Sequence, residues 1–429
     1  MSLFKTFFVN ATTIGNTTAE KSQPFFGVDS TKVEDKPTSL SHLKVCLLVE
    51  PSPFTYVSGY ANRFQEMIQF LVQNNDTVEV ITCDRQKKSK LEHWNGVRVH
   101  HTYGVTLLLY PNVTVSVDWN FKCFRILRQL QPDLIHVTSP GLMVLPSIIY
   151  ANLLGIPLLM SYHTHLPVYL ARYLFRWSDR IAWWWIKMTH SFADQTLVTS
   201  PQILDEFKQH EILRVDVWQK GVDTNCFHPD RADAYMRDKM TSQQPENFLL
   251  LYVGRLAIEK RLEDLKPILD ACPPDTCICF VGTGPQEASL RGLFEDSRAV
   301  FMGELHGLEL SQAFASADVF VFPSDSETLG FVVLEAMASG TPVVAANAGG
   351  VPSLIDHGKT SFLVETGNIA GFCDFITQLK DDKFRNAIGQ HARSEAENWN
   401  WESSMAHLRN HHYNQAIQNF ANRKKKLLP

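Results

Sequence analysis

Residues 323–352 constrain the fold more than any other part of the chain, because they place two glutamates on either side of a short turn. An apolar strand ends just before this segment, and residues 330–339 have the composition of a helix that a glycine terminates. A second apolar strand follows over 343–346. Glu327 is therefore predicted in the loop after a strand, and Glu335 inside the next helix.

Such a segment has a characteristic place in an open parallel sheet. Ligands bind outside the carboxyl ends of the strands, and helix N-termini attract anions. Glu327 and Glu335 beside an anion site favour a polyhydroxylated ligand that carries phosphate, such as a nucleotide sugar. On these two residues alone, an alternative stays open in which each acid only complements a helix dipole or faces solvent.

The rest of the chain alternates strands, loops and helices in the same way. Clear apolar strands occupy 44–49, 134–137 and 157–162, and a second series begins with 248–253 and 277–281. This order is typical of α/β proteins with doubly wound parallel sheets, and it predicts two Rossmann-like domains that face each other across a cleft.

Changes in composition divide the chain into four parts. At 429 residues, two or three domains are expected. We predict a disordered leader over 1–42, a first Rossmann-like domain over 43–221, a second Rossmann-like domain over 222–399, and a C-terminal helix over 400–429 that ends in a basic tail. The leader holds many hydroxyl side chains but no arginine, so a transit peptide is neither favoured nor excluded.

Composition excludes several classes of function. The formal net charge of −5 argues against general nucleic-acid binding, and the eight cysteines show no paired metal spacing. We interpret the cysteines as reduced thiols. The nearly uncharged stretch over 141–160 has the length of a membrane span, but Pro146, Gly155 and Pro157 divide it into a buried helix and a central strand.

Arg255 and Lys260 follow the strand over 248–253, directly after Gly254. A departing nucleoside diphosphate carries negative charge that cations and helix N-termini can neutralise. Arginine offers a fork for two oxygens, and lysine offers a mobile point charge. The sequence has no Asp-x-Asp metal motif, so we expect no metal and no other cofactor. The alternative is that both residues begin a solvated helix.

Further candidates follow other predicted strands. Gly282 and Gly284 suit a turn that faces a ligand, or simply a tight turn. Ser58 and Gly59 start the first helix and are candidate phosphate contacts from the other domain. His163 follows a strand and is predicted to face the cleft, although it could be a hydrogen-bonded core histidine.

The motifs resemble the donor site of a known enzyme family. Glu327 and Glu335, followed by 339–344 and the Gly-Gly-x-Pro of 349–352, resemble the signature of retaining glycosyltransferases of family 4, which have the GT-B fold. Four further stretches resemble the sulfoquinovosyltransferase subgroup of that family: 50–65, 139–144, 160–169 and 220–223. Ala61 departs from the subgroup, in which a basic residue is common at this position.

The resemblance implies transfer of sulfoquinovose from UDP-sulfoquinovose to diacylglycerol with retention at the anomeric carbon. It also implies that 43–221 is the acceptor-side domain, that 222–399 is the nucleotide-sugar-binding domain, and that the helix over 400–429 packs back on the N-terminal domain. It implies that Glu335 holds the ribose, Arg255 and Lys260 hold the diphosphate, and His163 lies near the donor sugar. The implied catalytic set is His163, Arg255, Lys260 and Glu327; the implied donor-binding set is Ser58, Gly59, Gly254, Arg255, Lys260, Gly282, Gly284, Glu327, Thr328, Leu329, Gly330 and Glu335. Two alternatives stay open: a mannosyl- or glucosyltransferase that acts on lipid, and a non-catalytic nucleotide-sugar-binding protein.

Two features concern the substrates. A sulfonate is a permanent anion, and Arg63 and Arg172 are the candidate cations for it in the first domain, unless both are surface charges. A lipid acceptor requires peripheral docking on an intracellular membrane, which would be a plastid membrane in a photosynthetic source. We predict that residues 169–187 dock, with Arg172, Arg176 and Arg180 on one helical face, and that the basic cluster 423–426 helps. The alternative is that the tryptophans of this segment are core residues.

Overall fold

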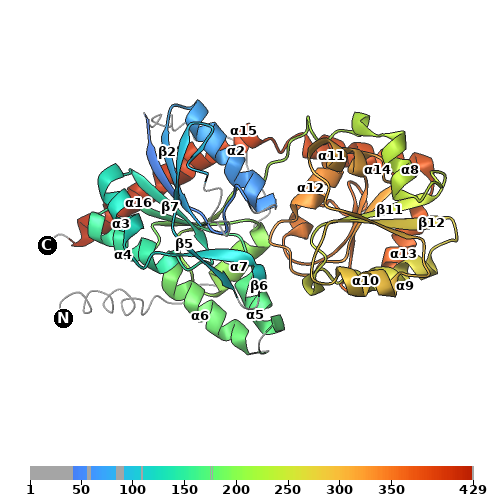
Figure 1. The fold of residues 1–429 in the computed structure, drawn as a ribbon, viewed down its shortest axis with the longest axis horizontal. Coiled ribbons are helices and arrows are strands. Elements are labelled where there is room, and N and C mark those ends of the chain that lie inside the picture. Colours follow the sequence, from blue (N-terminus) through green and yellow to red (C-terminus); the bar gives the residue numbers. More distant parts are fainter. Residues whose placement is uncertain are drawn as a thin grey trace, which may run out of the picture. The chain divides into compact units, whose positions relative to one another are not determined.

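The computed structural model describes residues 42–55, 59–83, 91–107, 110–173, 175 and 177–427. Ser58, Arg176 and residues 1–41 of the predicted leader lie outside this part, and the side chain of Arg172 is not described. The described chain forms two lobes, each built on its own mainly parallel sheet (Figure 1). The predicted α/β class is therefore confirmed.

The first lobe contains an eight-stranded sheet with the order β10-β9-β8-β7-β1-β2-β4-β3. All neighbouring strands are parallel except β3 and β4. Four of the five residues of β1 are buried, because parallel strands covered on both faces are continuously apolar. The strands are β1 (Lys44–Leu48), β2 (Thr77–Thr82), β3 (His93–Trp94), β4 (Val97–His101), β7 (Leu134–Ser139), β8 (Leu158–Tyr162), β9 (Gln195–Val198) and β10 (Val215–Val217).

Among the residues that the structure describes before β11, this lobe also contains six helices and one antiparallel ribbon. The ribbon pairs β5 (Tyr103–Leu107) with β6 (Tyr110–Val117), and sequence analysis did not identify it. The helices are α2 (Gly59–Gln73), α3 (Lys122–Leu130), α4 (Val144–Leu154), α5 (Leu166–Tyr173), α6 (Ser178–His190) and α7 (Pro201–Gln209).

The second lobe contains a six-stranded parallel sheet with the order β13-β12-β11-β14-β15-β16. All residues of β11, β12 and β14 are buried in one large apolar core. The strands are β11 (Phe248–Val253), β12 (Thr276–Val281), β13 (Ala299–Gly303), β14 (Val319–Phe322), β15 (Val343–Ala346) and β16 (Phe362–Val364).

Helices cover both faces of this second sheet, as expected of a doubly wound fold. Helices α8, α11 and α14 lie on one side, and α9, α10 and α13 lie on the other (Figure 1). The helices are α8 (Ala234–Met240), α9 (Leu265–Ala271), α10 (Glu287–Leu293), α11 (Gly307–Ala315), α12 (Phe331–Ala338), α13 (Ile369–Gln378) and α14 (Asp382–Ala396).

The C-terminal helices contact the first lobe. Helix α15 (Trp401–His407) packs on α2, and α16 (Asn414–Leu427) packs on β8 and β9. Between them the chain forms one stretch of π-helix, Leu408–Tyr413. Tyr413 is fully buried and belongs to the same apolar cluster as β1 and α2.

A buried ion pair fastens this π-helix. Arg409 donates from Nε and Nη2 to the two carboxylate oxygens of Asp76, at 2.6 and 2.7 Å. Asp76 also accepts a hydrogen bond from the backbone N–H of Leu43, one residue before β1. The pair therefore joins the C-terminal helices to the start of the first sheet.

One prediction for the docking segment is wrong. Helix α5 ends at Tyr173 and α6 begins at Ser178, so Arg172 and Arg180 lie on two separate helices and cannot share one continuous helical face. In the described part of the chain, no helix combines the length and the apolar character needed to span a bilayer. The stretch over 141–160 is divided into α4 and β8, as predicted.

We expect Arg409→Ala to lower the free energy of unfolding by about 3–5 kcal/mol, because it leaves the Asp76 carboxylate buried without its partner. Urea unfolding followed by circular dichroism measures this change. Arg98→Ala is the matched control, since Arg98 lies 3.8 Å from Glu79 with its side chain 61% exposed, and such a pair contributes about 1 kcal/mol or less. Equal losses in the two variants would contradict the assigned role of Arg409.

Candidate functional site

The candidate site lies where the order of strands reverses in the second sheet. Strand β11 has β12 on one side and β14 on the other, so the connections after β11 and β14 run in opposite directions. Open α/β sheets bind ligands at this switch point, outside the carboxyl ends of the strands. Gly254 and Arg255 follow β11, and Glu327 lies in the loop after β14, so the structure brings these predicted residues to one edge of the sheet.

A partly buried ion pair occupies this edge. The Lys260 ammonium, in a short 3₁₀ turn after β11, donates to Oε1 of Glu327. The side chains of Lys260 and Glu327 are 14% and 19% exposed. Burial alone would lower the pKa of Lys260, but Glu327 and the Tyr252 hydroxyl outweigh it and raise that pKa. Lys260 is therefore a positive charge held at the end of β11.

Glycines let the neighbouring loops approach each other closely. A Cβ atom at Gly282 would lie 2.1 Å from the carbonyl oxygen of Gly254, and one at Gly284 would lie 2.2 Å from that of Leu256. Gly282 also has a φ of +127°, which side chains rarely allow. The loops after β11 and β12 thus pack directly against each other. Arg255, which is half-buried, lies in the first of these loops.

A second glycine pair positions Glu327. The backbone N–H of Gly350 donates to the carbonyl oxygen of Glu327 at 2.8 Å. A Cβ atom at Gly349 would lie 2.1 Å from the same oxygen, and one at Gly350 would lie 2.3 Å from the carbonyl oxygen of Thr328. Gly330 then adopts a φ of +91° and starts α12. The Gly-Gly segment predicted from sequence therefore supports the backbone of Glu327 and Thr328, and Leu329 beside them is buried.

Glu335 lies in α12, the helix that follows the loop of Glu327. Its side chain is buried, and burial raises its pKa to about 8. Burial thus favours the protonated form of this carboxyl group, which can donate one hydrogen bond as well as accept others. Two adjacent ribose hydroxyls offer both kinds of partner.

Helix α2 of the first lobe contacts the start of α12, close to Glu327 and Glu335. A Cβ atom at Gly59 would lie 2.4 Å from the ring of Phe331, so the first residue of α2 abuts the first residue of α12. The backbone N–H groups at both helix starts are left without helical partners, which suits an anion. Thr328 also hydrogen-bonds across the lobes: its hydroxyl donates to the carbonyl oxygen of His163, and its own carbonyl oxygen accepts from Thr199.

His163 contacts this loop through its backbone, whereas its ring turns inward. The ring packs edge-on against Tyr60, Phe64 and Trp218 at centroid distances of 5.1–5.7 Å. Its Nε2 atom lies 2.8 Å from the Ser161 hydroxyl. Burial, with Arg63 nearby, lowers the pKa of His163 well below its usual value, so the imidazole is neutral.

Arg63 is buried, so the alternative that it is a surface charge, left open by the sequence, is excluded. Its side chain is fully buried, stacks on Trp218 at 4.2 Å, and donates from Nη2 to the carbonyl oxygens of Trp218 and Gln219. Among the described residues, its Nε and Nη1 atoms have no hydrogen-bond partner. The predicted role of Arg63 in holding the sulfonate stays a prediction.

Sequence analysis missed three contributors to the site. The Tyr252 hydroxyl, in β11, donates to the carbonyl oxygen of Arg255. Lys220 donates to the carbonyl oxygen of Ser353 in the second lobe, and Thr199 donates to Thr328. Lys220 is in a stretch that carried the family resemblance, which could have drawn attention to it; Thr199 and Tyr252 carry no comparable signal.

Comparisons with known proteins agree with this geometry. The family described as "Glycosyltransferase Family 4" matches residues 57–225, and the family described as "Glycosyl transferases group 1" matches residues 247–382. Sulfoquinovosyl transferase SQD2 of Arabidopsis thaliana is 42% identical over 392 residues, which cover 89% of this chain and 76% of that protein. A GDP-mannose-dependent alpha-mannosyltransferase of Mycobacterium tuberculosis is 32% identical over 348 residues, which cover 80% of this chain and 89% of that protein.

Solved structures show the same fold at low sequence identity. Sucrose-phosphate synthase from Thermosynechococcus elongatus aligns with a TM-score of 0.69 at 21% identity, covering 90% of this chain and 99% of that one. HepE of Anabaena in complex with UDP-glucose aligns with a TM-score of 0.66 at 21% identity, covering 90% of this chain and 100% of that one. The two Rossmann-like lobes are thus those of the GT-B fold, and the chain belongs to glycosyltransferase family 4.

Proposed function

We propose that this glycosyltransferase transfers sulfoquinovose from UDP-sulfoquinovose to diacylglycerol, with retention at the anomeric carbon and without a catalytic metal. The observation that carries the proposal is the 42% identity to a sulfoquinovosyl transferase over both lobes. The identity to a GDP-mannose-dependent enzyme is 32%. A sugar other than sulfoquinovose is therefore the second candidate.

The geometry supports a diphosphate leaving group at the end of β11. Lys260 and Arg255 supply positive charge there, and the starts of α2 and α12 supply backbone N–H groups. In the proposed binding mode, Lys260 exchanges its contact with Glu327 for a phosphate oxygen. Glu327 then becomes free to accept hydrogen bonds from the sugar hydroxyls.

The reaction itself needs no protein nucleophile. The bond from the anomeric carbon to the UDP oxygen breaks, and a bond from that carbon to the diacylglycerol hydroxyl oxygen forms on the same face. The acceptor proton passes to the departing phosphate oxygen. The protein's contribution is to stabilise the charge that grows on the diphosphate and to orient both substrates. The neutral His163 lies behind the Thr328 loop and positions it through its backbone carbonyl.

A lipid acceptor requires contact with a membrane, and α6 presents a suitable surface. Trp177, Ile181 and Trp184 recur at helical spacing and are 59%, 50% and 64% exposed. Arg180 is exposed on the same helix. Leu145, Ile149 and Leu153 form an exposed row on α4, which contacts α6. We propose that this α4–α6 surface docks on an anionic bilayer.

The proposed donor is tested by incubating the purified protein with diacylglycerol and a panel of UDP- and GDP-sugars, with products identified by mass spectrometry. We expect sulfoquinovosyl diacylglycerol to form with a kcat/KM at least ten-fold above that of any other donor, because the chain is 42% identical to a sulfoquinovosyl transferase. Turnover of another nucleotide sugar, with no turnover of UDP-sulfoquinovose, would show that the proposed donor is wrong. Binding of UDP-sugars without any turnover would favour the non-catalytic alternative.

Docking is tested by sedimentation with liposomes that contain phosphatidylglycerol. We expect binding that rises with anionic lipid and weakens with salt. The triple variant Trp177→Ser, Ile181→Ser and Trp184→Ser should bind at least ten-fold more weakly, because each large apolar side chain contributes about 1.5–3 kcal/mol when it leaves water.

The matched control is Tyr235→Ser, which removes an aromatic side chain that is 68% exposed on α8 of the second lobe. It should bind liposomes as the unmodified protein does. If a folded triple variant sediments as well as this control, α6 is not the docking surface.

A further inference from the structure

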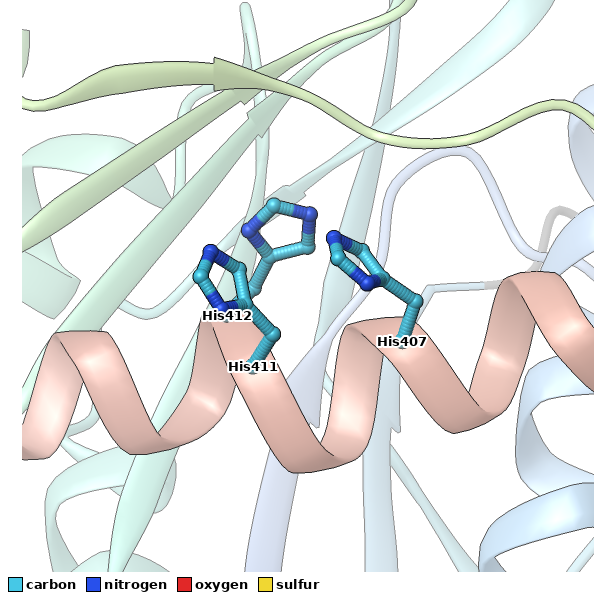
Figure 2. A group of neighbouring side chains, drawn as sticks. All are labelled: His407, His411 and His412. Carbon is cyan, nitrogen blue, oxygen red and sulfur yellow. The ribbon is translucent and has the colours of Figure 1, made fainter. Parts of the chain in front are cut away.

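Three histidines gather on one side of the C-terminal helical segment, away from the residues of the donor site. The ligating nitrogens of His407, His411 and His412 all lie within 4.8 Å of one another. Figure 2 shows the three rings on one side of the helix, clustered together. The rings of His407 and His411 stack at 4.7 Å, and that of His412 stands edge-on to both.

The π-helix explains why three residues at this spacing can meet. In an α-helix, residues four apart share a face and residues five apart do not. The stretch Leu408–Tyr413 is a π-helix, in which hydrogen bonds join residues five apart. This wider turn brings His412 to the side that His407 and His411 already share. Such π-bulges are frequent at functional sites.

Two further observations point to a ligand. The side chain of His412 is fully buried, and neither of its ring nitrogens makes a hydrogen bond of ordinary length and angle to a described residue; its polar neighbours are the Asp216 carboxylate and the Val217 backbone. The Oδ2 atom of Asp216, in β10, lies 3.7 Å from His412 Nδ1 and 3.9 Å from His411 Nε2. A buried imidazole without such a hydrogen bond costs free energy that a bound cation would offset.

We propose that His407, His411, His412 and Asp216 bind one divalent transition-metal ion of the Zn²⁺ type. Three imidazole nitrogens and one carboxylate oxygen match the number and the kind of ligands that Zn²⁺ takes in closed, four-coordinate sites. The nitrogens must draw closer, because Zn–N bonds are about 2.0–2.1 Å long. His411 is 53% exposed and His407 is partly exposed, so both side chains have room to turn toward the buried His412.

The ion would act on the structure of the first lobe and not on the sugar transfer. It would tie the π-helix to β10, the edge strand that precedes Trp218 and Gln219. The next residue, Tyr413, approaches His136 Nδ1 at 3.1 Å, and His136 Nε2 and His163 Nε2 each lie 2.8 Å from the Ser161 hydroxyl. The site therefore stabilises one end of a buried chain of hydrogen bonds. The other end of this chain is His163, whose backbone contacts the Thr328 loop.

The test uses the full chain without an affinity tag, stripped with EDTA and then dialysed. Calorimetric titration with ZnCl₂ should show one ion per chain, and the ion should raise the melting temperature. His407→Ala and His411→Ala, both at positions accessible to solvent, should each bind Zn²⁺ at least about ten-fold more weakly and lose the rise in melting temperature. His391→Ala removes an exposed histidine of α14 and should behave as the unmodified chain does.

The result that overturns the proposal is the absence of stoichiometric Zn²⁺ binding, or equal binding by the His407 and His411 variants and the control. A titration with Co²⁺ gives a second readout, because four-coordinate Co²⁺ absorbs strongly in the visible range. That absorption should appear in the His391 variant and be lost in the His411 variant. Its persistence in the His411 variant would also contradict the proposal.

Discussion

The ion pair between Lys260 and Glu327 is the interaction on which the donor site depends. It lies at the carboxyl ends of β11 and β14, where the strand order of the second sheet reverses. Two partly buried charges are costly unless each has its partner. The pair therefore keeps an ammonium and a carboxylate at the switch point before any substrate arrives. In the proposed binding mode, a diphosphate takes the place of Glu327 beside Lys260, and the sugar hydroxyls take the place of Lys260 beside Glu327.

The surrounding loops provide the rigidity that such a pair needs. Gly282 closes on the loop of Gly254, and Gly349 closes on Glu327, both at distances that exclude a side chain. The first lobe contributes the start of α2, and the C-terminal helices brace that lobe through Arg409 and Asp76. The last residues of the chain thus stabilise the lobe that approaches the donor site from the other side.

Much of this could be predicted because it rests on local patterns. Strands buried on both faces, as at β11, read as continuous apolar runs, and the spacing of Glu327 and Glu335 placed one acid in a loop and one in a helix. Burial and long-range packing could not be predicted in the same way. Arg63 was predicted as a candidate cation for the sulfonate, with a surface charge as the alternative, and burial against Trp218 could not be predicted from its sequence position. The regular spacing of arginines suggested one helix, whereas the chain breaks between α5 and α6, and the histidines meet only because α15 continues as a π-helix.

The most direct test of the account is kcat/KM for Arg255→Ala and Lys260→Ala, measured with the preferred donor and excess EDTA. The control is Lys359→Ala, whose side chain is 67% exposed in the second lobe. The account predicts that both site variants lose about 2–4 kcal/mol of transition-state stabilisation, as expected for one preorganised charge. The control and the unmodified enzyme should remain active in EDTA. Near-normal kcat/KM in either site variant, or activity that EDTA abolishes and that Mg²⁺ or Mn²⁺ restores in the His411→Ala variant as well, would contradict the metal-free diphosphate site.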